Sequence, residues 1–409
     1  MSSARLRPDR SNDASVGNNS HFSKDTATGT DTLSVTEERW RNIRPFLHLH
    51  QLELRDRYKP DWTPSWKTTG QNPRDCDDGP PRSALCAQMD ARLFPGDHLV
   101  NVKYIASYFH PDEVGVMQYL NSPELRSYPD NACVPLVRGP LRDPANSDIS
   151  YVVTPLLRDF DDPRFDTKGE ALGCLMQVFK GLAFMHRQNV AYRCPTMEFM
   201  VDPSPLYPDM FHPNVPSRSR NLQHRAERTT RTRQPPRYYF TDFAYAAKYE
   251  QGAPRQATPV PISTYSERDR EMIPPEFRGY RPGDSMPLRD PFPADVFCLG
   301  MMVRTKFVEA YSGLEFLRRL ADDMTVLDPS QRPTMDFAVQ RLEDICSTLS
   351  RSAQRSRLVH KSGPRGFTRS VAHALRTLRY KISRLDPIPL PPYAVPTNMM
   401  PPAPVPRHP

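Results

Sequence analysis

The hydrophobic pattern of this chain changes from alternation to helical spacing, and this change limits the fold more than any other feature. Residues 99–105 alternate after a turn signal at residues 95–97, and residues 151–154 predict a short buried strand. Further along, apolar residues recur at intervals of three and four, as in amphipathic helices. This spacing covers residues 167–186, 294–307, 313–324 and 334–349. Strands followed by helices predict an α+β fold with a strand-rich first part and a mostly helical second part.

Two shorter segments fit this order. Residues 111–113 read Pro-Asp-Glu, which a first helical turn favours, and Val116 and Leu120 continue the segment as an apolar helix face. Residues 237–241 predict a return to strand after a stretch rich in proline and arginine.

Composition separates a folded middle from two polar ends. Hydrophobic residues make up 38% of the 409, below the usual share of about 45–50%, and 46 residues are proline. Polar ends of this kind bury too little apolar surface to offset the entropy of ordering. We expect six segments: a disordered N-terminus at 1–36, an extension packed on the domain at 37–79, a small strand-rich part at 80–156, a larger helical part at 157–350 with an insert at 203–237, a basic segment at 351–384, and a disordered proline-rich tail at 385–409.

Several classes of protein are excluded by what the sequence lacks. No stretch approaches the roughly 18 consecutive apolar residues of a membrane helix, and residues 1–36 lack the apolar run of a signal peptide. We therefore expect an intracellular protein, cytoplasmic or nuclear, with no transmembrane segment. The seven cysteines form no C-x-x-C pair, which argues against a zinc site and against a disulfide framework.

Positive charge is concentrated in two segments. The net charge is +8, residues 351–384 hold ten Lys or Arg and no acid, and residues 217–233 hold six Arg and one Glu. The first segment contains a short basic amphipathic helix, formed by Leu375, Leu378 and Ile382 beside Arg376, Arg379 and Lys381. Such a segment binds the phosphates of nucleic acid or an anionic membrane, or lies as a solvated or docked tail. The sequence leaves these alternatives open.

Two motifs near the end of the folded part resemble those of eukaryotic protein kinases. Residues 290–300, Asp-Pro-Phe-Pro-Ala-Asp-Val-Phe-Cys-Leu-Gly, are similar to the kinase D-V-x-x-x-G helix. Residues 324–334, Met-Thr-Val-Leu-Asp-Pro-Ser-Gln-Arg-Pro-Thr, are similar to the M-x-x-D-P-x-x-R-P-T stretch that closes a kinase domain. Their order and separation are typical of kinases.

Further motifs extend the resemblance over about residues 80–350. Residues 273–276, Ile-Pro-Pro-Glu, are similar to the A-P-E motif, whose glutamate pairs in kinases with the arginine of R-P-T, here Glu276 with Arg332. Residues 239–244 resemble D-F-G, with Ala244 in place of the glycine. Two short motifs of the insert are typical of kinase-like proteins abundant in mushroom-forming fungi: Leu206-Tyr207-Pro208 and Phe211-His212-Pro213. The resemblance implies a bilobal protein kinase-like fold.

The resemblance also implies roles for individual residues. Kinases use a strand lysine on the ATP phosphates, a helical glutamate that holds it and the D-F-G aspartate on Mg²⁺. Lys103, Glu113 and Asp242 match these three positions, so ATP and Mg²⁺ are the implied cofactors.

The catalytic loop departs from the kinase pattern H-R-D-x-x-x-x-N. Without a gap, Tyr192-Arg193-Cys194 matches H-R-D and Phe199 matches Asn; with one deletion, Glu198 matches Asn and could ligate a metal. Neither alignment supplies an aspartate base. A thiol near its usual pKa of about 8.5 has no standing negative charge, so Cys194 does not replace the carboxylate. The loop of Arg193 and Cys194 is therefore predicted to be degenerate.

A glycine-rich loop is also missing, since no G-x-G-x-x-G precedes Lys103. These departures imply a pseudokinase, a scaffold or allosteric regulator of protein partners that retains some ATP binding. Two alternatives remain open: a weakly active or atypical Ser/Thr protein kinase, and an adaptor that works through its basic and proline-rich tail.

Overall fold

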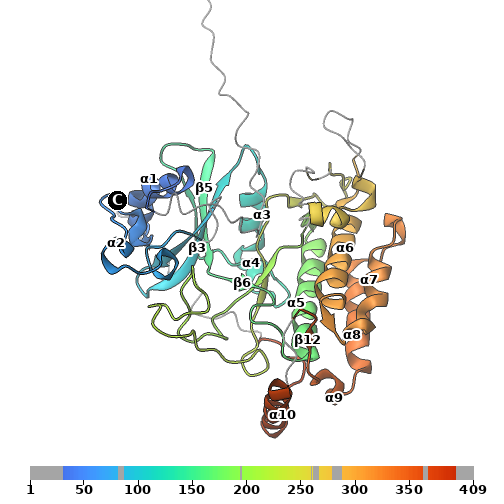
Figure 1. Cartoon of the computed structure of the whole chain (residues 1–409). Coiled ribbons are helices and arrows are strands. Elements are labelled where there is room, and N and C mark those ends of the chain that lie inside the picture. Colours follow the sequence, from blue (N-terminus) through green and yellow to red (C-terminus); the bar gives the residue numbers. More distant parts are fainter. Residues whose placement is uncertain are drawn as a thin grey trace, which may run out of the picture.

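The computed structural model shows a mixed α+β protein, so the predicted fold class is confirmed at this level. It describes residues 31–81, 87–193, 196–258, 260, 267–278, 288–362 and 367–392. Residues 1–30 and 393–409, which belong to the ends expected to be disordered, lie outside the described residues. Figure 1 shows the strand-rich part beside a group of helices, with α3 between them.

The strand-rich part is a five-stranded antiparallel sheet in the order β1-β2-β3-β5-β4. Its strands are β1 Leu52–Glu53, β2 Gln88–Leu93, β3 His98–Ala106, β5 Ile149–Pro155 and β4 Arg138–Arg142. The predicted strands at 99–105 and 151–154 are β3 and β5. They pair directly with each other, with Lys103 opposite Val152.

One face of this sheet is covered by α1, Val35–Leu49. Trp40 and Leu47 of the helix are buried with Val102 and Val153 of the sheet, and the Trp40 ring lies 6.0 Å from that of Tyr151. Burying large apolar side chains in this way contributes about 1.5–3 kcal/mol for each. The extension therefore forms a hydrophobic layer with the sheet.

The helix α1 begins inside the segment expected to be disordered. Ser34 Oγ accepts a hydrogen bond from the backbone of Glu37, whose carboxylate accepts one from Ser34 N at 3.0 Å, which forms a capping box. Arg57 Nε donates to Glu37 Oε1 at 2.6 Å from the following segment. These contacts correct the predicted boundary, because order starts before residue 36.

The second part consists of helices around a long central one, α5. Thr167 Oγ1 caps α5 by accepting from Glu170 N at 3.0 Å. The helices of the chain after α1 are α2 Trp66–Thr69, α3 Glu113–Leu120, α4 Pro123–Arg126, α5 Lys168–Arg187, α6 Pro291–Met302, continued as a π-helix Val303–Val308, α7 Arg318–Met324, α8 Met335–Thr348, α9 Arg351–Gln354 and α10 Phe367–Ile382. Short 3₁₀ turns are Asp56–Tyr58, Pro73–Asp75, Glu267–Met272, Pro275–Phe277, Glu315–Leu317 and Pro329–Gln331. All four helical segments predicted from apolar spacing are present.

Short strands position the loops between the two parts. A three-stranded sheet consists of β6 Arg158–Asp159, β8 Phe199–Val201 and β9 Tyr238–Phe240. Two further pairs are β7 Val190–Ala191 with β10 Ala247–Lys248, and β11 Tyr311–Ser312 with β12 Val359–His360. The three-stranded sheet and the β7–β10 pair fix the chain on both sides of the loop at 192–198. They also fix the segment that follows residue 240.

The insert at 203–237 bonds to both parts of the molecule. His212 Nε2 lies 3.0 Å from Asp77 Oδ1 of the extension, and Arg220 pairs at 2.7 Å with Asp97 of the β2–β3 turn. At its other end, Thr232 Oγ1 donates to Glu170 Oε1 of α5 at 2.8 Å. The insert is thus a packed connection between the sheet and the helices.

The tail departs from its predicted disorder in the part that the structure describes. Pro387 and Pro389 are buried against α5 at Gly169 and Gly173. A Cβ on Gly169 would stand 1.7 Å from the Pro387 carbonyl oxygen, so only glycine allows this approach. Residues 385–392 therefore pack as a strap on α5.

Helix α10 docks on the body through its polar side. Tyr380 and Thr230 share a hydroxyl hydrogen bond of 2.7 Å, while Leu375, Leu378 and Ile382 are exposed. Figure 1 shows α10 at the edge of the molecule. The predicted basic helix is present, and of the alternatives open for it the structure shows a docked segment.

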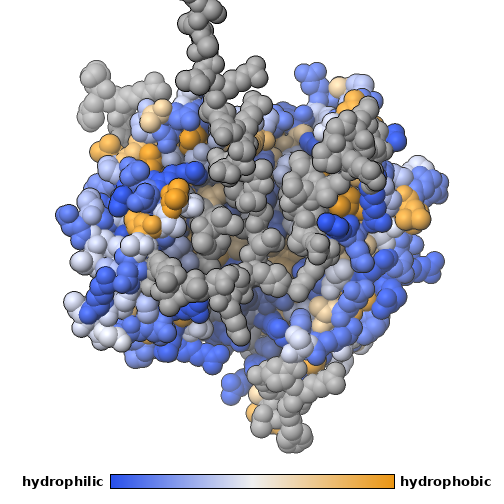
Figure 2. Space-filling model, turned by 45° about the horizontal axis from the view of Figure 1, so that its top comes forward, coloured by the Kyte–Doolittle hydropathy of each residue, from blue (hydrophilic) through white to orange (hydrophobic). Residues whose placement is uncertain are grey.

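No helix within the described residues is both long and apolar enough to cross a bilayer. On the face drawn in Figure 2, most described surface residues are hydrophilic, and the apolar ones form small separate groups. Scattered apolar residues are normal on a protein surface.

Candidate functional site

Lys103 lies in the middle of β3, on the sheet face opposite α1. Successive side chains of a strand point to opposite faces, and Val102 belongs to the α1 core. Ile105, two residues after Lys103, packs with α3 and α5 in the other core. The alternation of β3 therefore directs the lysine toward α3.

The first residue of α3 contacts this lysine. Glu113 Oε1 lies 2.5 Å from Lys103 Nζ, and the glutamate side chain is 0% exposed. Among the described residues, Glu113 Oε2 has no hydrogen-bond partner. A buried carboxylate is costly unless it is paired, so Lys103 compensates for the burial of Glu113.

Asp242 approaches the same lysine from the segment after β9. Its Oδ1 lies 3.0 Å from Lys103 Nζ and also accepts from Ala244 N at 3.3 Å. The Asp242 side chain is 36% exposed, which makes it the open side of the site. Lys103, Glu113 and Asp242, predicted separately from the sequence, thus form one charge cluster.

The charges of this cluster stabilise one another. Burial disfavours charge on Lys103, but the carboxylates of Asp242 and Glu113 outweigh it and raise the pKa of the lysine above its usual value. Burial likewise opposes charge on Asp242, but the Lys103 ammonium outweighs it and lowers the pKa of this carboxyl below its usual value. Both groups are therefore ionised at neutral pH.

The backbone of the predicted catalytic loop is held by one buried carboxylate. Asp295 of α6 accepts hydrogen bonds of 2.7 Å from the backbone N–H groups of Tyr192 and Arg193. His186 Nε2 lies 3.1 Å from Asp295 Oδ2. Bonds from an N–H to a carboxylate are charge-assisted and strong. Asp295 is not among the predicted site residues, although an acid inside the apolar stretch 291–302 signals that a buried partner is needed.

The loop side chains provide no carboxylate base in the described residues 192, 193, 196 and 197. Arg193 donates to the carbonyl oxygen of Thr258 at 2.8 Å, which directs its guanidinium to the segment after β10. Cys194 lies outside the described residues, so its predicted place in the degenerate loop stays a prediction.

Glu198 follows this loop, directly before β8. Burial raises the pKa of Glu198 above its usual value, against the hydrogen bond of 2.9 Å from Thr196, and the charge of Asp242 adds to this rise. Thr241 N donates to Glu198 O at 3.1 Å, so backbone pairing brings the segments of the two acids together. Phe199 is buried within β8. This arrangement favours the alignment in which Glu198, rather than Phe199, stands beside Asp242.

In the described part of the chain, protein side chains alone do not form a complete metal centre. Among the described residues, no group of three or more His, Cys, Asp or Glu is arranged to hold a metal ion. Asp242 and Glu198 offer two carboxylates.

The predicted ion pair of Glu276 and Arg332 is present and has a forked geometry. Arg332 Nη1 and Nη2 donate to Glu276 Oε1 and Oε2, each at 2.7 Å, and the arginine side chain is 0% exposed. Arg332 also donates to the carbonyl oxygen of Pro293 at 2.9 Å. Two parallel charge-assisted bonds fix the segment at 275–277 against the start of α6.

The fold and this site define a mixed α+β protein with a lysine held between two carboxylates where the sheet meets the helices. No protein-family model matches the chain, and a search of curated proteins finds no match. Any relationship to kinases is therefore a proposal that depends on the motifs and on the geometry of these residues.

Proposed function

We propose that this chain is a pseudokinase with a bilobal kinase-like fold, which binds Mg-ATP weakly and acts as a scaffold or allosteric regulator of other proteins. The observation that carries the proposal is the contact of Lys103 Nζ with both Glu113 and Asp242. Protein kinases pair a lysine on the third strand with a glutamate on the next helix, and use the D-F-G aspartate for Mg²⁺. Lys103 lies in the third strand and Glu113 opens the helix after it.

Contacts in the helical part support the same proposal. The fork of Glu276 and Arg332 joins the residues that match A-P-E and R-P-T. Asp295, the aspartate of the D-V-x-x-x-G match, holds the loop at 192–193. The partners in these bonds are separated by 56 to 103 positions, so local sequence alone does not bring them together.

The residues present fit a magnesium nucleotide. Mg²⁺ is usually held by one or two carboxylates together with substrate phosphates, and Asp242 and Glu198 are two such carboxylates. Burial, with the charge of Asp242 as a smaller cause, raises the pKa of Glu198. A cation beside Glu198 would relieve the repulsion from Asp242. Lys103 would bind phosphate oxygens, and bound Mg-ATP would supply the phosphoryl group. Binding is expected to be weak because no glycine-rich loop covers the phosphates.

Transfer of that group lacks a proton acceptor. A positioned general base contributes roughly 10²–10⁴-fold to a rate, and the predicted loop has Cys194 where kinases have aspartate. Binding without efficient transfer is the behaviour of a regulator that changes shape or stability with its ligand. Protein partners are the expected targets of such a regulator.

The decisive experiment measures thermal unfolding with and without Mg-ATP, together with transfer of labelled phosphate. We expect a small rise in the unfolding midpoint and no transfer above background. Lys103→Met should abolish the rise, whereas Lys180→Met should retain it, because Lys180 pairs with Glu343 on the surface of α5 and α8 at 2.8 Å.

Other outcomes would point to other functions. Transfer that Lys103→Met abolishes would establish a weakly active Ser/Thr kinase. Neither a midpoint shift nor transfer, with partner binding retained by residues 351–409 alone, would establish an adaptor that works through its tail.

A further inference from the structure

A basic cavity lies under α10, away from the charge cluster. Its volume is about 590 Å³, within the range of about 300–1,000 Å³ that is usual for small-molecule sites. Four parts of the chain line it: the segment before α5, the insert, the segment around β12, and α10. The lining residues are Arg164, Phe165, Asp166, Arg228, Arg357, Leu358, Val359, His360, Ser362, Ala372 and Arg376.

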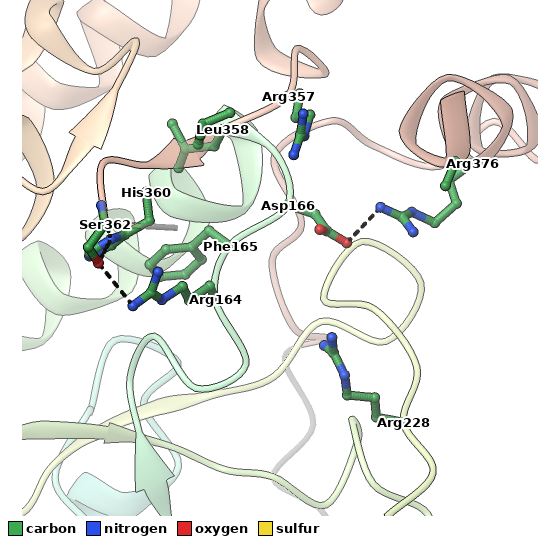
Figure 3. A pocket seen from close by; sticks show the side chains of 11 residues that line it. Arg164, Phe165, Asp166, Arg228, Arg357, Leu358, His360, Ser362 and Arg376 are labelled. Atoms are coloured by element: carbon green, nitrogen blue, oxygen red, sulfur yellow. Dashed lines mark hydrogen bonds and ion pairs between the residues drawn. The ribbon is translucent and has the colours of Figure 1, made fainter. Parts of the chain in front are cut away.

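Positive charge dominates this lining. Four of the residues are arginines, and the one carboxylate, Asp166, lies 3.4 Å from Arg376. Figure 3 shows the guanidinium groups of Arg228, Arg357 and Arg376 around Asp166. Burial and the charge of Arg164 lower the pKa of His360, so this ring does not add charge at neutral pH. The cavity therefore has an excess of three positive charges.

The backbone around the cavity is fixed by hydrogen bonds. Leu358 N donates to Asp166 O at 3.0 Å, and Lys168 N donates to Ser356 O at 3.2 Å, so the segment that carries Arg357 is tied to the start of α5. Tyr380 bonds to Thr230, two residues from Arg228. The arginines therefore come from separate, anchored elements, and their convergence is not a property of one flexible tail.

Like charges gathered around a cavity repel one another unless an anion lies between them. Guanidinium groups match the oxygens of phosphate in a forked geometry, which makes arginine the usual residue for phosphate recognition. Three excess charges and a cavity much larger than one phosphate favour a ligand with more than one phosphate group.

We propose that the cavity lined by Arg164, Arg228, Arg357 and Arg376 binds a small anion carrying several phosphate groups, either free in solution or as the headgroup of a lipid. The site is separate from the charge cluster and does not depend on the function proposed for it. Its ligand would contact both basic segments, 217–233 and 351–384, which meet in this cavity.

Binding is tested by calorimetry with inositol hexakisphosphate and inorganic pyrophosphate, without Mg²⁺. Arg228→Gln and Arg357→Gln should each weaken binding about tenfold, because each removes a charged hydrogen-bonding group. Asp166→Asn should tighten binding roughly threefold by removing the one opposing charge. Lys103→Met should leave it unchanged.

The matched control is Arg379→Gln, which removes the same charge from an exposed position of α10 outside the lining. It should weaken binding by less than twofold. Unfolding midpoints of all variants are measured alongside, and Arg228, which is exposed, provides a variant whose folding should be unaffected.

The two sources of phosphate are distinguished with vesicles. Sedimentation with phosphatidylcholine vesicles, with or without a bisphosphorylated inositol lipid, reports headgroup binding. Binding of the soluble probes supports a free ligand, and binding only to the phosphorylated vesicles supports a lipid. The proposal is overturned if no probe binds, or if Arg379→Gln weakens binding as much as Arg228→Gln. It is also overturned if a single-stranded oligonucleotide binds more tightly than the probes and every arginine variant weakens that binding equally.

Discussion

The charge cluster and the loop at 192–198 lie on neighbouring elements but differ in how closely they match the kinase pattern. In the cluster, the side chains predicted from the kinase pattern lie together, with Lys103 in contact with both Glu113 and Asp242. In the loop, the backbone is held by Asp295, while the sequence has no aspartate to act as base. The comparison shows that the backbone support of this loop is independent of its side chains, because a backbone N–H bonds to Asp295 whatever side chain follows.

The largest expected effect tests the proposed function at Cys194, where the kinase pattern has its aspartate base. Cys194→Asp should raise labelled-phosphate transfer by about 10²-fold, since a positioned base contributes at least that much. Cys194→Ser adds no charge and should leave transfer at background. A Cys194→Asp variant that is equally inactive would show that the loop differs from a kinase loop in more than its base.

The next effect tests the support of the loop. Asp295→Asn should lower the free energy of unfolding by about 2 kcal/mol, because the amide loses the charge and one of the two acceptors for the N–H groups of Tyr192 and Arg193. Chemical denaturation measures this change.

Asp322→Asn is the control for Asp295→Asn, since its pair with Arg304 is on the surface and contributes about 1 kcal/mol or less. An equal loss in both variants would contradict the role of Asp295 as the anchor of the loop.

A smaller effect tests Glu198 as a neighbour of Asp242. Glu198→Gln should weaken Mg-ATP binding about tenfold while leaving ATP binding without Mg²⁺ unchanged, because it removes one carboxylate ligand. Titration calorimetry with and without Mg²⁺ provides both values. Glu250→Gln, at an exposed position, should have no effect, and an unchanged affinity in Glu198→Gln would remove this residue from the site.

The smallest effect concerns pH. The pKa of Asp242 is lowered in the folded protein, so its contribution to stability is complete above its unfolded pKa of about 3.9 and is lost as the pH falls through the lower folded value. The pKa of Lys103 is raised, so its contribution is complete below about 10.4 and is lost at higher pH. The stability difference between wild type and Asp242→Asn should be constant from about pH 5 to 10 and shrink below that range. A difference that varies between pH 6 and 8 would show that the cluster is not ionised as described.

Part of the fold and site could be predicted because it depends on local patterns. Alternation over residues 99–105 placed Lys103 on a strand, and the tripeptide at 111–113 placed Glu113 at the start of a helix. The pairing of Glu276 with Arg332 followed from the resemblance to kinases. In each case the types of residue in a short segment indicate the structure.

Other features could not be predicted because their partners are distant in the sequence. Asp295 bonds to backbone groups about a hundred residues earlier, and His212 of the insert lies against Asp77 of the extension. The start of α1 had a local signal in Ser34 and Glu37, which form the capping box, but the polar composition around them obscured it. Four segments line the basic cavity, and none of them alone has a sequence pattern that indicates a cavity.

The strap on α5 has a consequence for how the protein is made. Gly169 and Gly173 leave room on the helix for a backbone that is synthesised roughly two hundred residues later. Until Pro387 and Pro389 leave the ribosome, this part of α5 lacks the segment that covers it. The final packing of the central helix is therefore a late event in biogenesis, and a stop codon before residue 387 would yield a protein whose middle, rather than its end, is left incomplete.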